Sequence, residues 1–131
     1  SLIIAAMRAL RGQLLSHPAT MPMLAVRMPT TEPMFDLIET FLTRMTAFGM
    51  SAPDALDMIN AATAYTVGHA LAEPHEPVGG TGGPPSDLVL AALATRPTLA
   101  QAMSQRATYD PAQHFERGLA ALLSGWVAAA P

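Results

Sequence analysis

Apolar residues recur at intervals of three and four along most of the chain, and this periodicity constrains the fold more than any other feature. The pattern is clearest over residues 34–48, where one helical face would carry Met34, Phe35, Ile38, Phe41, Leu42, Met45 and Phe48. Thr30-Thr31-Glu32-Pro33 precedes this run as a helix start signal, and Gly49 follows it as a C-cap. No segment shows the convincing alternation of apolar and polar residues that is typical of a strand. The sequence therefore predicts an all-α fold.

The same periodicity predicts further helices before and after this one. A first helix carries Ile3, Ile4, Met7, Leu10 and Leu14 on one face and ends near Pro18. A long helix begins at Ser51, an N-cap with Asp54 three residues later, and ends before Glu73. We expect the remaining helices over residues 21–27, 87–94 and 98–107, and from Pro111 to the end of the chain.

Length and composition indicate one domain that spans residues 1–131. The chain is 50% hydrophobic with a formal net charge of −3, which suits a single hydrophobic core and is unlike a disordered chain. Residues 73–86 are rich in glycine and proline, and we expect a flexible loop there. Only about 45 residues follow this loop, too few for a second stable core, so it is not a domain boundary.

Charge and cysteine content exclude several classes of protein. All seven cationic residues are arginine and ten acids outnumber them, so the chain lacks the basic surface of a nucleic-acid-binding domain. The absence of cysteine excludes disulfides and thiol-based metal sites. No run reaches the roughly 18 apolar residues of a membrane helix, and the N-terminus lacks the charge order of a secretion signal. We therefore expect a cytoplasmic protein without a membrane partner.

The histidines do not form a pattern that indicates catalysis or metal binding. His69 shares a predicted helix face with Tyr65 and Glu73, where a structural histidine competes with a ligand-binding or sensing one. His75 lies beside Glu73 and Glu76, but on a flexible backbone where solvated loop charge is the simpler interpretation. There is no nucleophile-elbow motif and no phosphate-binding loop. We expect no enzymatic activity, no bound metal and no cofactor.

The long helix over residues 52–72 is apolar on more than one face, which predicts a partner subunit. The protein's own core covers one face, and a second copy is the natural cover for the other. Small residues on this helix and on the last one would let helices approach closely in a four-helix bundle. The residues expected at this homodimer interface are Ala64, Gly68, Ala120, Ala121, Leu122 and Gly125.

Three stretches carry a resemblance to a known family. They are Leu14-Leu-Ser-His-Pro18, Phe48-Gly-Met-Ser-Ala-Pro-Asp-Ala-Leu56 with the following Ala64-Tyr-Thr-Val-Gly68, and Phe115-Glu-Arg-Gly-Leu-Ala-Ala-Leu-Leu-Ser-Gly125. In this order and spacing the chain resembles the C-terminal ligand-binding and dimerisation domain of TetR-family repressors, in the tetracycline-repressor-like branch. Members of that family read DNA through an N-terminal helix-turn-helix domain, which no part of this chain matches. The apolar start of the sequence also resembles a helix entered part-way, as expected for the regulatory part of a longer protein.

The resemblance implies a ligand pocket between the first, second, third and fourth helices. Members that recognise magnesium–tetracycline have a histidine and a glutamine where this chain has Met23 and Phe41, so we expect a more apolar effector that needs no metal. Five of the nine methionines, at 21, 23, 28, 34 and 45, lie around this region and suit an adaptable pocket. By register with the family, the ligand-binding residues are Met23, Val26, Arg27, Ile38, Phe41, Leu56, Ile59, Asn60 and Thr63.

These features predict the effector-binding and dimerisation domain of a transcriptional repressor. A small, apolar or amphipathic molecule would shift the protein between DNA-competent and DNA-incompetent dimers, with DNA bound only through the N-terminal domain. The main alternative is a helical protein-interaction or scaffold module that uses the same apolar faces without a small-molecule ligand. A helical enzyme is a third interpretation.

Overall fold

The structure is a computed structural model that describes residues 2–20, 23, 30–77, 79–80, 82–106 and 108–129. Within these ranges all the regular structure is helical, which confirms the predicted all-α fold. The predicted helix over 21–27 lies outside the described residues, apart from Met23. The elements are α1 (Leu2–Ser16), the 3₁₀ turn η1 (Pro18–Thr20), α3 (Glu32–Ala47), α4 (Ala52–Ala72), α5 (Asp87–Leu93), α6 (Pro97–Gln105) and α7 (Pro111–Ala129).

Local capping explains where the helices begin and end. The Ser51 hydroxyl accepts a hydrogen bond from the Asp54 amide at 3.2 Å, as the sequence predicted. Asp110 caps α7, because its Oδ1 accepts from the Ala112 amide at 2.9 Å. Thr31 occupies the N-cap of α3 without a side-chain bond. Gly49, just after α3, has φ +92°, the left-handed conformation that favours glycine at a helix C-terminus.

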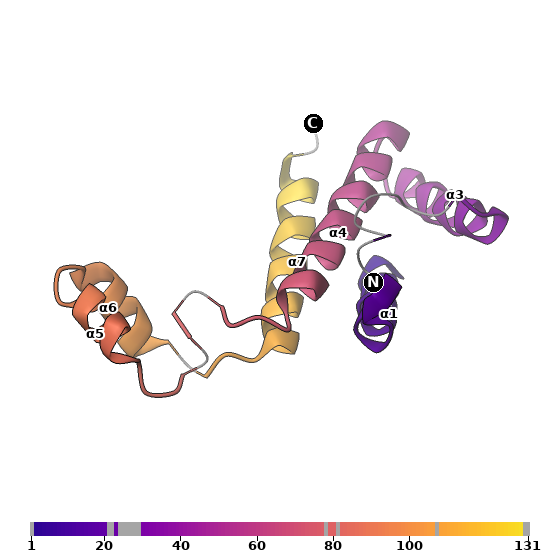
Figure 1. The fold of residues 1–131 in the computed structure, drawn as a ribbon. Helices are drawn as coiled ribbons and strands as arrows, with labels where there is room; N and C mark the ends of the chain where they lie inside the picture. The colour runs from indigo at the N-terminus through magenta and orange to yellow at the C-terminus, as the bar shows by residue number, and fades with distance from the viewer. Residues whose placement is uncertain are drawn as a thin grey trace.

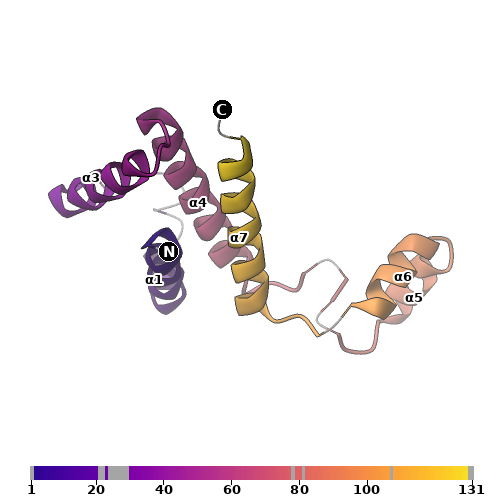
Figure 2. The same ribbon diagram turned by 180° about the vertical axis from the view of Figure 1, so that it is seen from behind.

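Helix α4 is the centre of the fold. In Figures 1 and 2 α7 runs along one side of α4, while α1 and α3 lie on the other side, and α4 packs against all three. Its close-packed face carries small residues, with Ala55, Ala62 and Ala70 fully buried. Larger side chains from the surrounding helices fill the core against this face. The main cluster comprises Ile3, Met7, Phe41, Ala55, Met58, Ala62, Phe115 and Leu119.

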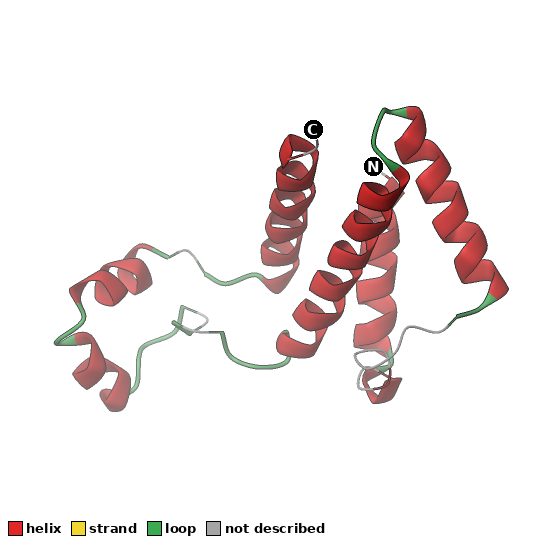
Figure 3. Cartoon of the chain, turned by 90° about the horizontal axis from the view of Figure 1, so that it is seen from above, coloured by secondary structure: helices red, strands yellow, loops and turns green. Residues whose placement is uncertain are grey.

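Helices α5 and α6 form an arm that projects from this body. They pack against each other and stand apart from the longer helices in all three ribbon views (Figures 1 to 3). Leu88 is 81% exposed and Leu90 is 52% exposed. The arm therefore exposes apolar side chains that no other described part of the protein covers.

The predicted loop over 73–86 forms one side of the base of this arm. Its described residues contain no helix or strand, and its flexibility stays a prediction. Gly79, Gly80 and Gly82 all have positive φ, so the glycines allow the chain to turn here. The Arg106 guanidinium on the returning segment lies over the Tyr109 ring, 5.0 Å from its centroid, and donates to the Gly80 carbonyl at 3.5 Å.

Candidate functional site

Four of the residues predicted to bind ligand are at least partly buried on α3 and α4, two helices that pack directly against each other. Phe41 is buried in the main core cluster, and Ile59 packs against the same cluster. Ile38 and Thr63 are partly buried. Phe41 and Ile59 thus belong to the core packing of these two helices.

The other predicted ligand residues are placed differently. Asn60 is exposed and Leu56 is 39% exposed, so in the single chain neither lies inside the core. Met23 is 74% exposed, and Val26 and Arg27 lie outside the described residues. Register with the family predicted Leu56 and Asn60 as ligand-binding positions but could not say which face of α4 its neighbours would cover.

One exposed stripe runs along α4. Leu56, Asn60, Ala64 and Gly68 follow each other at intervals of four and are all exposed, and a Cβ added at Gly68 would meet nothing within 4 Å. On α7, Ala120, Ala121 and Gly125 are also exposed, whereas Leu122 packs partly against the core. Five of the six predicted interface residues are therefore open on two helices that pack side by side.

Tyr65 of α4 packs closely over Gly118 of α7. The Tyr65 hydroxyl donates to the Phe115 carbonyl at 3.2 Å, and the rings of Tyr65 and Phe115 stack with centroids 5.7 Å apart. A Cβ added at Gly118 would overlap the Tyr65 hydroxyl. The small residue is therefore required here by the neighbouring helix.

We expect Gly118→Ala to destabilise the fold by about 1–3 kcal/mol, because Tyr65 must leave its place on Phe115. The matched control is Gly12→Ala on α1, where a Cβ would meet nothing within 4 Å. That variant should gain roughly 0.5–1 kcal/mol from the better helix propensity of alanine. Urea unfolding of both variants measures the difference. Equal changes in the free energy of unfolding would contradict the close packing of Tyr65 over Gly118.

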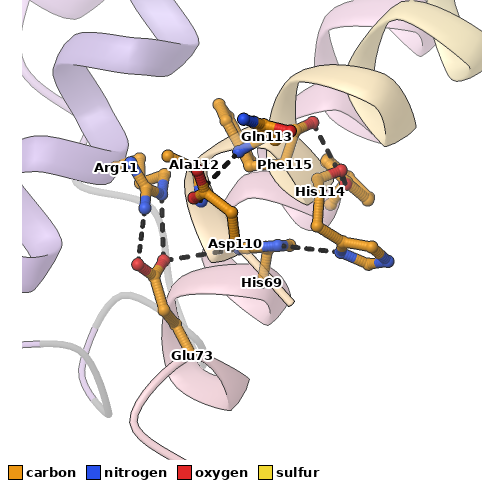
Figure 4. A network of polar contacts seen from close by, with 9 residues as sticks. Arg11, His69, Glu73, Asp110, Ala112, Gln113, His114 and Phe115 are labelled. Carbon is orange, nitrogen blue, oxygen red and sulfur yellow. Dashed lines mark hydrogen bonds and ion pairs between the residues drawn. The ribbon is translucent and has the colours of Figure 1, made fainter. Parts of the chain in front are cut away.

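Ionisable side chains from three helices meet beside this contact (Figure 4). Arg11 of α1 donates to both carboxylate oxygens of Glu73, at 2.9 and 2.5 Å, just after the end of α4. His69 lies between Glu73 and His114 of α7: its Nδ1 is 3.5 Å from Glu73 Oε2, and its Nε2 is 3.2 Å from His114 Nδ1. The predicted face shared by Tyr65, His69 and Glu73 is therefore present.

Burial dominates the electrostatics of His69, whose side chain is 7% exposed. Desolvation is the main reason that its pKa is lowered, because the charged ring loses water. The Glu73 carboxylate opposes this shift, while His114 and Arg11 add to it. Sequence reasoning missed both long-range partners, because Arg11 and His114 are far from His69 in sequence and carry no local signal.

A second ion pair joins α1 to α7, whereas the first joins α1 to the end of α4. Arg8 Nε donates to Glu116 Oε1 at 2.5 Å and Arg8 Nη2 donates to Glu116 Oε2 at 2.8 Å. The guanidinium holds the pKa of Glu116 below its usual value through this hydrogen bond. Because both side chains are well exposed, we expect the pair to align the helices more than to stabilise them.

No group of three or more histidine, cysteine or acidic side chains among the described residues is arranged to hold a metal ion. None of the helices in the described part of the chain has the length and apolar character needed to cross a membrane.

Comparison with protein families decides the classification. The family described as "Tetracyclin repressor-like, C-terminal domain" matches residues 3–129. The chain belongs to this family. Searches of curated proteins and of solved structures gave no significant match. As a tetracycline-repressor-like C-terminal domain, the chain is of the kind that binds ligands and dimerises in transcriptional regulators.

Proposed function

We propose that this tetracycline-repressor-like domain binds a small, mostly apolar effector and that binding releases the repressor dimer from DNA. The observation that carries the proposal is the family match over residues 3–129, which includes all the described helices except Leu2 at the start of α1. DNA contact would come through an N-terminal helix-turn-helix domain, since the seven arginines and ten acids of this chain make no basic surface.

Dimerisation would occur through α4 and α7. Ala64 and Gly68 on one helix, and Ala120, Ala121 and Gly125 on the other, are exposed and small. Two-fold pairing of these faces would place four helices in a bundle and cover them, which a single chain cannot do. The exposed leucines of the α5–α6 arm offer additional apolar surface to a second copy.

The effector would bind among Ile38, Phe41, Ile59 and Thr63 of α3 and α4, a set that we call the α3–α4 layer. Because Phe41 is buried in the core, a ligand must displace part of the existing packing, and such a rearrangement couples binding to helix positions. The surrounding methionines suit this role, since their side chains adapt to different shapes. Leu56 and Asn60 would lie at the edge of the site, and Met23, Val26 and Arg27 would complete it.

Fluorescence titration with 8-anilinonaphthalene-1-sulfonate, an amphipathic probe, tests this proposal. We expect saturable binding that is the same in magnesium and in EDTA, because no metal takes part. Magnesium–tetracycline should not compete, since Met23 and Phe41 replace its polar partners. Probe binding that disappears with EDTA would contradict the proposal of a metal-free site.

A matched pair of tryptophan variants locates the probe. Ile59→Trp should weaken binding at least about tenfold by filling the site, at some cost in stability from overpacking. Leu90→Trp places the same ring on the arm, where the native side chain is 52% exposed, and should leave affinity unchanged. If both variants bind the probe normally and the protein still dimerises, the scaffold interpretation is favoured, for which the exposed leucines of the arm are the supporting observation.

A further inference from the structure

We propose that His69 and His114 form a proton-responsive contact between α4 and α7, which loosens when both rings are protonated. This histidine contact (His69 with His114) is independent of the proposed effector function, because it concerns the stability of the chain itself. It lies at the crossing of the two helices that also carry the exposed stripes.

The geometry of the contact determines which ring nitrogens carry a proton. A nitrogen–nitrogen contact of 3.2 Å accommodates one shared proton. The Glu73 carboxylate faces His69 Nδ1 and favours a proton there, so Nε2 of neutral His69 is the acceptor. His114 Nδ1–H is then the donor. In this state the hydrogen bond joins α4 to α7 without a charge on either ring.

A second proton on the pair removes that hydrogen bond. When both rings are imidazolium, both nitrogens across the 3.2 Å gap carry hydrogens and no acceptor remains. The two cations then repel each other beside a third cation, Arg11. Glu73 cannot offset all of this charge, because both of its oxygens already accept from Arg11.

The surroundings of His69 determine which ring must move. The Phe115 ring meets it edge-on with centroids 5.3 Å apart, and the Tyr65 ring lies 5.8 Å away. His69 is thus enclosed by Arg11 of α1, by Tyr65 and Glu73 of its own chain segment, and by Phe115 and His114 of α7. His114 is exposed and also contacts Tyr109, so it can turn toward solvent while His69 stays buried. That movement breaks the histidine hydrogen bond, while the contact of Tyr65 with Phe115 still joins α4 to α7.

The direction of the pH effect follows from linkage. Burial lowers the pKa of folded His69 below the unfolded value of about 6.5, so between the two values the unfolded chain binds more protons. The contribution of His69 to the free energy of unfolding is therefore fully present above pH 6.5. It is lost as the pH falls from 6.5 toward the pKa of His69 in the folded chain. Because unfolding then takes up one proton, the unfolding equilibrium constant rises by up to about tenfold for each unit by which the pH falls.

Urea unfolding between pH 8 and pH 5.5, in buffers with EDTA, tests the proposal. The native chain should become less stable below pH 6.5, and His69→Gln should lose this part of the dependence. The matched control is His75→Gln, at an exposed position in the loop after α4, which should keep the native pH profile. A native profile in His69→Gln would overturn the proposal.

Nitrogen NMR of the imidazole rings supplies a readout that does not depend on stability. At pH 8 we expect His69 to carry its proton on Nδ1 and to titrate below 6.5. Replacing His114, an exposed residue, by glutamine should raise the pKa of His69, because it removes a neighbouring positive charge. Titration of native His69 at the ordinary value, or no response to His114→Gln, would show that the rings are not coupled. This variant also keeps the proposal testable if His69→Gln does not fold.

Discussion

Phe115→Ala is expected to reduce the free energy of unfolding by about 3–5 kcal/mol, a large fraction of the stability of a domain of this size. Phe115 is 1% exposed and belongs to the main core cluster. Its ring stacks on Tyr65 and lies under the Arg11 guanidinium, 5.4 Å from the ring centroid. The truncation would leave a cavity where α1, α4 and α7 meet, and urea unfolding at pH 8 measures its cost.

Phe48→Ala is the matched control for this prediction. Phe48 is 87% exposed just after α3, so the same truncation should change the free energy of unfolding by less than about 0.5 kcal/mol. Similar losses in the two variants would mean that Phe115 is not the centre of the core. A large loss at Phe48 alone would indicate that a second copy covers that side chain.

Gly68→Arg is expected to weaken the dimer by at least about 100-fold while the chain stays folded. Gly68 is the last residue of the exposed α4 stripe, and a Cβ added there would meet no other part of the chain within 4 Å. Two-fold symmetry would bring the substitution into the interface twice, which buries two unpaired cations of like charge. Sedimentation equilibrium over a concentration series measures the dissociation constant, and circular dichroism verifies the fold.

Gly12→Arg provides the same chemical change on α1, again at a position with open space around the added atom. This variant should dimerise like the native chain, because α1 does not carry the proposed interface. Native dimerisation by Gly68→Arg would place the subunit contact elsewhere, with the exposed leucines of the arm as the next surface to test. Monomeric native protein at tens of micromolar would contradict the homodimer itself.

Local signals in the sequence predicted most of the helices. The apolar spacing over 34–48 with Gly49 behind it corresponds to α3, which ends at Ala47. Ser51 with Asp54 marked the beginning of α4, and Asp110 with Pro111 marked that of α7. These features could be predicted because helix periodicity and caps depend on residues only a few positions apart.

The sequence by itself determined the helices, their apolar faces and the family. Only the tertiary structure decided which side chain each face meets: His69 meets His114, Arg11 meets Glu73, and Gly118 admits Tyr65. It also placed Asn60 on the exposed stripe and not within the α3–α4 layer. The physical reason is that spacing along a helix defines a face, whereas the partner of that face depends on how helices distant in sequence pack together.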